Sequence, residues 1–206
     1  MRVGLVRPAR VKTTVQEAHV RKVVVYTLMS LDGAVDNPGE YFALGNAPGE
    51  PPGFDSVMDD SEQRIIGTQD AVLLGRHMYD EWSQYWPTAD DQPFADFINS
   101  VKKYVVTSTP LSNEWHNAEA VEAPVEDLVL DLKARPGGDI GVHGSIQLAQ
   151  SLLAAGLVDE LRLVVGPAWG CSGRRLFASG GDTRRLELLS AIPTPSGSVL
   201  LAYRVL

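Results

Sequence analysis

The sequence contains very little cysteine, because Cys171 is the only one among its 206 residues. An internal disulfide is therefore impossible, which is typical of proteins that work in a reducing compartment such as the cytoplasm. One cysteine and four scattered histidines also give no spacing that would hold zinc. We therefore predict a cytoplasmic protein without a metal site, and a zinc-dependent base deaminase is excluded.

Long apolar runs are also missing, and none approaches the length of about 18 residues that spans a membrane. Residues 1–21 carry several basic side chains but no continuous apolar core of a signal peptide. We interpret residues 1–20 as an N-terminal extension and residues 21–206 as one domain. The formal net charge of −8 argues against a nucleic-acid partner, because such proteins present a basic surface.

Several motifs of nucleotide-binding and hydrolytic enzymes are absent as well. The sequence has no Gly-x-Gly-x-x-Gly, no P-loop and no Gly-x-Ser-x-Gly. Ser100-Val-Lys-Lys103 matches Ser-x-x-Lys in form, but it leads into a predicted strand and lacks the companion motifs, so we interpret it as chance. An ordinary Rossmann domain and a serine hydrolase are therefore disfavoured.

Strand and helix patterns alternate along the rest of the chain. Apolar and β-branched runs predict strands at 23–29, 71–74, 104–107, 140–142, 160–166, 184–190 and 198–205. Apolar residues at helical spacing predict helices at 55–66, 93–101 and 125–134. The last two strands look like an antiparallel hairpin. This order predicts an α/β fold with a central mixed, mostly parallel sheet flanked by helices.

The segment from Asp139 to Asp159 is the most informative, because it has the pattern of a strand, a glycine turn and a helix. Gly144 permits a tight turn and close approach of a ligand to the backbone. Ser145 is placed to cap the helix with its hydroxyl, and Gly156 suits the helix end. Such a helix start attracts phosphate, although an ordinary connection between a strand and a helix gives the same pattern.

Three further segments place polar residues at the carboxyl end of a predicted strand. Asp32 is either a turn-capping carboxylate or a substrate-facing one. The segment 75–77 contributes an arginine and a histidine at an expected helix start, which either suit a diphosphate or are simply solvated. The hydroxyls at 107–109 either bind phosphate or form a turn before Pro110. Ligands collect outside the carboxyl ends of strands in open α/β sheets, so the segments together predict a ligand site.

Taken in order, these segments carry a family resemblance. The motifs Ser-Leu-Asp-Gly, Gly-Arg-x-x-Tyr, Tyr-Val-Val-Thr-Ser, Gly-Asp-Ile-x-Val-x-Gly-Ser and Gly-Leu-Val-Asp-Glu-x-Arg-Leu, with Ser-Gly-Arg-Arg-Leu-Phe at 172–177, resemble the bacterial RibD C-terminal domain family. That family is the reductase domain of riboflavin biosynthesis, and its fold is similar to that of dihydrofolate reductase. The resemblance implies a dihydrofolate reductase-like domain, NADPH as cofactor and hydride transfer to a small molecule.

The resemblance also implies roles for individual residues. The substrate-facing, catalytic position falls on Asp32, and the nicotinamide would lie near Ala34 and Val35. The cofactor phosphates would lie along three groups of residues: Gly75, Arg76, His77 and Met78; Thr107, Ser108 and Thr109; and His143, Gly144, Ser145, Ile146 and Gln147.

The chain departs from the family pattern in several places. It has His143-Gly144 where the family often has two glycines, and Met78 where the dihydrofolate reductase pattern has a threonine. It also lacks the zinc deaminase domain of the full riboflavin enzyme. We predict a stand-alone NADPH-dependent reductase, resembling 5-amino-6-(5-phosphoribosylamino)uracil reductase, that acts on a small pyrimidine- or pteridine-like substrate. The alternative is a binding or interaction protein that keeps the fold without hydride transfer, which His143 and Met78 favour.

The C-terminal strands predict a homodimer, because few helices remain to cover them. An apolar sheet face must be buried against something, and a two-fold interface is the commonest solution. The family resemblance suggests the same. In a monomer, residues 1–20 are the rival cover, through Val11, Val15 and Val20.

Overall fold

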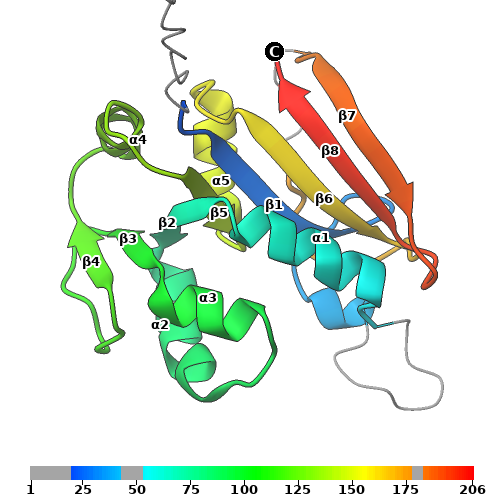
Figure 1. The fold of residues 1–206 in the computed structure, drawn as a ribbon, viewed down its shortest axis with the longest axis horizontal. Helices are drawn as coiled ribbons and strands as arrows, with labels where there is room; N and C mark the ends of the chain where they lie inside the picture. The colour runs from blue at the N-terminus through cyan, green and yellow to red at the C-terminus, as the bar shows by residue number, and fades with distance from the viewer. Residues whose placement is uncertain (1–19, 43–52, 178–182) are drawn as a thin grey trace, which may run out of the picture.

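A computed structural model describes residues 20–42, 53–177 and 183–206. Its centre is an eight-stranded sheet in the order β4-β3-β2-β5-β1-β6-β8-β7 (Figure 1). The strands are β1 (Val23–Ser30), β2 (Gln69–Gly75), β3 (Lys102–Val106), β4 (Ala118–Val121), β5 (Asp139–His143), β6 (Glu160–Gly166), β7 (Leu186–Pro193) and β8 (Val199–Val205). All pairs from β4 to β6 are parallel, and β8 and β7 follow as an antiparallel hairpin. The predicted mixed, mostly parallel sheet is therefore confirmed.

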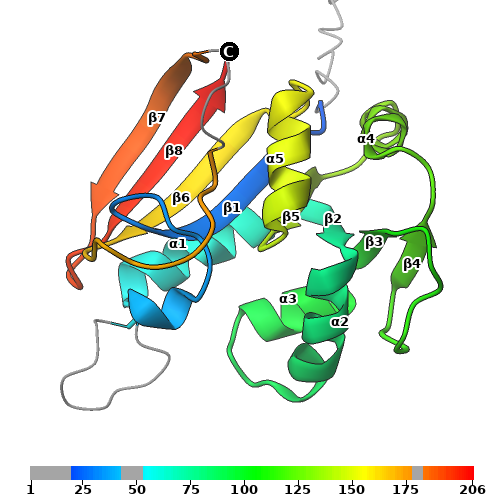
Figure 2. The same ribbon diagram turned by 180° about the vertical axis from the view of Figure 1, so that it is seen from behind.

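Helices cover both faces of this sheet (Figures 1 and 2). They are α1 (Ser56–Ile66), α2 (Arg76–Tyr85), α3 (Phe94–Ser100), α4 (Val125–Lys133) and α5 (Ile146–Ala154), with short 3-10 helices at Pro38–Glu40 and Trp86–Thr88. Side chains of α4 and α5 form the core on one face, and side chains of α1, α2 and α3 form the clusters on the other.

The central strands are buried on both faces, as expected of parallel strands between two helical layers. Along β1, Val23 and Val25 pack in the core that contains Leu152 of α5, whereas Tyr26 points to the opposite face and packs with Met58 of α1. Every residue of β5 is buried. The two helical layers thus fix β1 and β5 in the middle of the molecule, which positions the carboxyl end of β5.

The structure differs from the sequence prediction in one strand and in one cap. The strand β4 is unpredicted, because Ala-Glu-Ala-Val has little β propensity; it forms by parallel pairing with β3, in the register Lys103 with Ala118. Ser145 does not cap α5 with its side chain, so that prediction was wrong. The end of α5 agrees with the prediction, since Gly156 has the left-handed φ of +70°.

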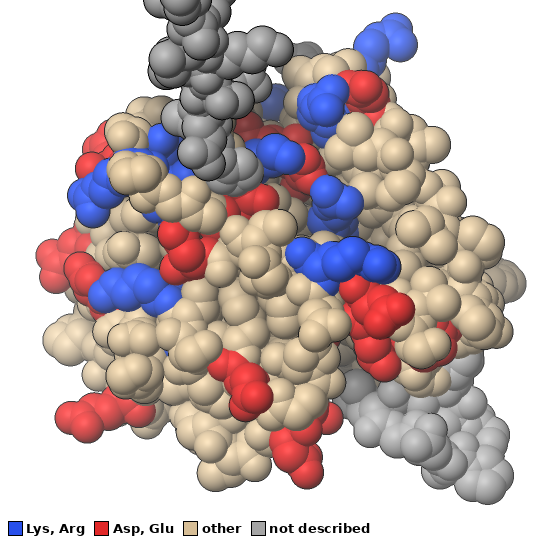
Figure 3. All heavy atoms as spheres, viewed as in Figure 1, with Lys and Arg blue, Asp and Glu red and all other residues tan. Residues whose placement is uncertain are grey.

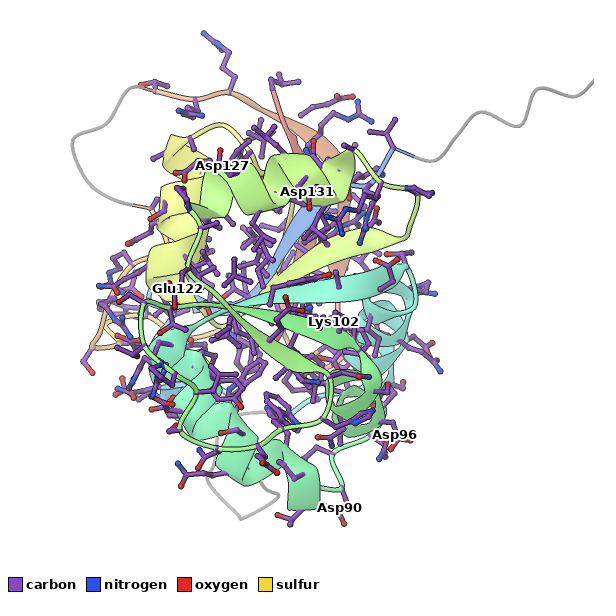
Figure 4. The ribbon with its side chains drawn as sticks, turned by 90° about the vertical axis from the view of Figure 1, so that its left-hand side faces the viewer. Asp90, Asp96, Lys102, Glu122, Asp127 and Asp131 are labelled. Carbon is purple, nitrogen blue, oxygen red and sulfur yellow. The ribbon has the colours of Figure 1, made fainter. Side chains whose placement is uncertain are left out.

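The two edges of the sheet differ in character. Figure 4 shows the side of the molecule with β4, where acidic side chains are spread from Asp127 and Asp131 on α4 to Asp96 on α3 and Asp90 before it. On the opposite edge, β7 exposes Leu188 by 54% and Ile192 by 40%. No described helix lies over β7 or β8 on the α5 side in Figure 2. The β7 edge therefore carries a strip of exposed apolar side chains, at Leu186, Leu188, Leu189 and Ile192.

One interpretation falls almost wholly outside the described residues. The N-terminal extension is described only at Val20, so its role as a cover for the C-terminal strands is not tested.

Within the described residues, no helix is long and apolar enough to cross a membrane. On the face drawn in Figure 3, basic and acidic side chains are interspersed.

Candidate functional site at the carboxyl end of β5

The carboxyl edge of the sheet is uneven, because β5 ends before its neighbours. His143, the last residue of β5, pairs with Tyr26, yet β1 continues to Ser30. On the other side, β2 continues past its pairing with β5 to Gly75. Helix α5 starts over the shortened strand. Three predicted segments therefore meet here, at the sheet edge where open α/β folds bind ligands.

The turn that links β5 to α5 has the backbone form that the sequence predicts. Gly144 has a φ of +66°, which strongly favours glycine. The Ser145 hydroxyl accepts a hydrogen bond from the Gly75 amide at 2.9 Å, instead of capping α5. This bond joins the end of β2 to the start of α5. The first-turn amides of α5 consequently have no side-chain cap, and they form a region of positive potential that suits an anion.

Gly144 is also required by its packing against α2. A Cβ at this position would lie 2.7 Å from Cε of Met78 and 3.2 Å from Trp82. The thioether of Met78 therefore covers the side of Gly144 on which a Cβ would project. Methionine is flexible, so this cover can move more easily than a backbone segment.

Arg76 connects the start of α2 with the loop after β3. Its Nε donates to both carboxylate oxygens of Asp80 at 2.8 Å, and its Nη1 donates to Thr109 Oγ1 at 2.6 Å. The Thr107 and Thr109 hydroxyls are 3.2 Å apart. The hydrogen bond from Ser112 and then that from Arg76 lower the pKa of Asp80. A guanidinium and two hydroxyls thus lie together, and this donor set suits a phosphate.

The other predicted cofactor positions vary in exposure. His77 is 78% exposed at the side chain and lies 3.3 Å from Glu81. Ser108 and Gln147 are exposed. Ile146 has its side chain in the core, so only its backbone faces the turn.

His143 has its imidazole inside the protein and not at the turn. Its Nε2 lies 2.8 Å from Oε1 of Gln69, and the residue is 2% exposed. Burial lowers its pKa to about 3, so the ring is neutral. A β5 residue at this register points into the layer under α3, where the imidazole packs against Phe94 and Phe97. That His143 lies along the cofactor phosphates therefore stays a prediction, and it concerns the backbone of this residue.

Asp32 ties two loops together. Its carboxylate accepts from Ser30 Oγ at 2.7 Å, from the Gly170 amide at 3.1 Å and from Arg175 at 3.1 Å. The Ser30 hydrogen bond is the main cause that lowers its pKa. A lowered pKa favours the ionised carboxylate, and an ionised carboxylate has no proton to donate. This arrangement corresponds to the turn-capping alternative for Asp32, with an added ion pair.

The loop after β1 is anchored to the loop after β6. Ala34 forms a bridge with Arg175, and both Ala34 and Val35 are buried. Arg174 donates to both oxygens of Asp36 at 2.8 Å. Sequence reasoning missed this Asp36–Arg174 pair, because the partners are 138 residues apart and neither belongs to a periodic pattern.

A half-buried acid on α1 was also missed. Glu62 lies beside the Tyr26 hydroxyl, and burial raises its pKa to about 7. A signal existed in the sequence, because Glu62 falls between Met58 and Ile66 at the helical spacing of the buried face. Among the described residues, no group of three or more His, Cys, Asp or Glu could hold a metal ion.

The sheet order and the turns define a dihydrofolate reductase-like fold. The structure of dihydrofolate reductase from Enterococcus faecalis, complexed with NADP(H), matches 89% of this chain and 96% of that chain, with a TM-score of 0.56 and 15% identity. A putative riboflavin biosynthesis protein from Shewanella sp. PV-4 matches 90% of this chain and 99% of that chain, with a TM-score of 0.65 and 17% identity.

The sequence places the chain within this fold class. The RibD C-terminal domain matches residues 21–200, so the chain belongs to the RibD C-terminal domain family. The uncharacterized protein YyaP of Bacillus subtilis (strain 168) is 32% identical over 139 residues, which are 65% of this chain and 73% of that protein. Family and fold together support a reductase-like function.

Proposed function

We propose that this chain is an NADPH-dependent reductase that transfers hydride to a small pyrimidine- or pteridine-like substrate. The observation that carries the proposal is the junction at Ser145 and Gly75, which brings the start of α5 and the start of α2 together. Arg76 joins the Thr107–Thr109 hydroxyls to the same edge. Three phosphate-suited segments thereby converge, although they are far apart in the sequence.

The donors at this edge fit the phosphates of a dinucleotide. The uncapped amides of α5 would hold the diphosphate, and Arg76 with Thr109 would hold the phosphate on the adenosine ribose. When bound, the cofactor supplies the hydride. The protein would orient the reacting carbon, exclude water and stabilise the atom that receives charge.

A non-catalytic ligand-binding or interaction protein is the second candidate. Met78 against Gly144 favours it, because the thioether lies over the turn that a diphosphate would approach. In that case the fold would be kept without cofactor affinity.

Titration with NADPH separates the two candidates. Trp82 lies near Gly144, so we expect NADPH to quench tryptophan fluorescence at micromolar concentrations. Loss of NADPH absorbance with 5-amino-6-(5-phosphoribosylamino)uracil or dihydrofolate would then identify hydride transfer. Unchanged fluorescence up to millimolar NADPH would reject the reductase in favour of the second candidate.

A further inference from the structure

Lys103 of β3 is the most deeply buried charged side chain among the described residues, with no exposed surface. Its ammonium donates to the carbonyl oxygens of Ile98 at 2.7 Å and Val101 at 3.0 Å, at the end of α3. It also lies 4.5 Å from the centre of the Trp115 ring. Carbonyls at a helix end and the face of an indole both carry partial negative charge, so they attract this ammonium.

No carboxylate compensates this charge within the described residues. Arg21 and Glu160 are also buried, and each forms an ion pair with a group of opposite charge. Lys103 forms no such pair there, and the residues paired with it on the neighbouring strands are Val72 and Ala118. A buried charge is costly unless an opposite charge offsets it. The surroundings of Lys103 therefore favour its neutral form.

Lys103 also lies where α3 meets the loop between β3 and β4. We call this loop, residues 107–117, the β3–β4 connector. The Lys103 amide donates to the Asn117 carbonyl at 2.8 Å, and the Asn117 side chain donates to the carbonyl of the last residue of α3 at 2.8 Å. The indole of Trp115, which packs over the Lys103 ammonium, donates to Asn99 Oδ1 at 2.8 Å. This end of the connector is thus held on α3 by contacts that surround one buried charge.

The other end of the connector belongs to the proposed phosphate site. Thr107 and Thr109 lie there, and Arg76 of α2 donates to Thr109 Oγ1 at 2.6 Å. Tyr79 of α2 donates to the carbonyl of Asn113, further along the connector. The connector is therefore supported by α2 on one side and by α3 on the other, and opening at α3 would remove the second support.

Lys102 is the charged neighbour that acts on Lys103. Burial, and then Lys102, lower the pKa of Lys103 to about 8. Lys102 itself pairs with Glu119 of β4 at 2.6 Å. Burial also raises the pKa of Tyr79, which packs against Trp115, so Tyr79 keeps its proton up to about pH 9. Other titratable side chains on β2, α3 and the connector are exposed: Asp70, Asp96, Glu114 and His116.

We propose that Lys103 is a pH-sensitive switch for the β3–β4 connector, which separates from α3 more readily while the Lys103 ammonium is charged. In the open state this ammonium reaches water and holds its proton more tightly than in the closed state. Protonation therefore favours opening, and loss of the proton favours closure. The neutral amine keeps two N–H groups, so it can still donate to Ile98 and Val101 in the closed state.

The expected size of the effect follows from the two proton affinities. The Lys103 pKa is about 8 in the closed state and returns to the ordinary 10.5 when the side chain is solvated. A rise from about pH 7 to about pH 9 should then lower the opening equilibrium by about tenfold. The switch does not depend on the proposed reductase function, because opening can be measured without cofactor.

Hydrogen exchange of the full chain, followed by NMR at these two pH values, measures the opening. The reporter is the Lys103 amide, because its bond to Asn117 breaks when the connector leaves α3. After correction for intrinsic exchange, we expect its protection to rise about tenfold in the wild type. In Lys103→Met the amide should be more protected at pH 7 and equally protected at pH 9. Lys133→Met is the matched control, since Lys133 pairs with Asp159 at 2.6 Å, and it should keep the wild-type rise.

Two results would overturn the proposal. One is equal protection of the wild-type Lys103 amide at the two pH values. The other is a rise in Lys103→Met as large as in the wild type. If Lys103→Met does not fold, carbon NMR of the Lys103 side chain in the wild type decides. Its titration midpoint must lie well below 10.5, and a midpoint at 10.5 would reject the switch.

Discussion

The side chains of Arg76 and Asp80 form a two-pronged contact, in which Nε lies 2.8 Å from each carboxylate oxygen. The pair is one helical turn apart on α2, at the point where the cofactor phosphate is proposed to bind. Asp80 therefore orients the guanidinium toward Thr109 and also competes with any phosphate for its charge. Both effects can be measured separately.

Removal of Arg76 should change the cofactor preference. Arg76→Ala should weaken NADPH binding by roughly 10- to 150-fold and leave NADH nearly unchanged, because a charge-assisted contact contributes on the order of 1.5–3 kcal/mol. Fluorescence titration with both cofactors measures this. Arg135→Ala is the control, since Arg135 forms a similar pair with Asp131 on α4. Equal losses for both cofactors would place Arg76 on the shared diphosphate or in a structural role.

Neutralising Asp80 should have the opposite effect. In Asp80→Asn the guanidinium keeps its contacts with Thr109 and Pro110 but loses the competing charge. Exposed ion pairs are worth roughly 0.2–1 kcal/mol, so NADPH affinity should rise by up to about fivefold. Glu81→Gln, which alters the neighbouring exposed pair with His77, serves as the control. A loss of affinity in Asp80→Asn would show that orientation outweighs competition.

Gly144 should be sensitive to the addition of a single methyl group. Gly144→Ala places an L-residue at φ +66°, which costs roughly 1–2 kcal/mol, and pushes its Cβ against Met78. Urea unfolding should therefore show a larger loss than for Gly197→Ala, where φ is +87° but the nearest atom is 3.8 Å away. Adding Met78→Ala to Gly144→Ala should remove the difference that is due to contact. Wild-type stability in Gly144→Ala would refute this account of the turn.

The strand–turn–helix order of this fold could be predicted because its signals are local. The run of β-branched residues in β1 and the glycine before α5 act within a few residues of themselves. The contact of Ser145 could not be predicted from local sequence. Its hydroxyl could accept either from an amide of its own helix or from the amide of Gly75, and it accepts from Gly75 because β2 packs beside β5.

Long-range pairing explains the parts of the candidate site that the sequence did not reveal. The partners of Asp32 are Gly170 and Arg175, which only the folded loops bring within reach. The direction of His143 depends on the register of β5 with β1, because a shift by one residue would turn the imidazole to the other face. The sequence could predict that the site segments meet at the carboxyl edge of the sheet. It could not predict which partner each side chain contacts there.

The half-buried acid Glu62 should make stability depend on pH. Its folded pKa of about 7 lies above the ordinary 4.5, so its contribution is fully present below about pH 4.5 and is lost as the pH rises to about 7. Glu62→Gln should therefore gain stability relative to wild type over this range, by on the order of 2–3 kcal/mol. Urea unfolding at several pH values measures the difference. His143, whose pKa is lowered to about 3, has the opposite slope but is common to both proteins. A pH-independent difference would show that Glu62 is not protonated in the folded state.

The β7–β8 hairpin should be the interface of a homodimer. The register places Leu186 beside Val205 and Leu188 beside Tyr203, on a sheet face that no described helix covers (Figure 2). Strand β6 is already covered, since Leu161 and Leu163 belong to the core under α5. Such an apolar strip at a sheet edge is commonly buried against a second copy.

Light scattering at micromolar concentration tests the dimer. We expect a mass near twice the 22.3 kDa of one chain, and a mass near 22.3 kDa for Leu188→Glu. Leu130→Glu is the control, because Leu130 is 57% exposed on α4 and Leu188 is 54% exposed on β7. Deletion of residues 1–20 should leave the dimer intact if the second copy, and not the extension, covers this face. A wild-type chain that scatters as a monomer would reject the interface, and it would return the extension to its rival role as the cover of β7 and β8.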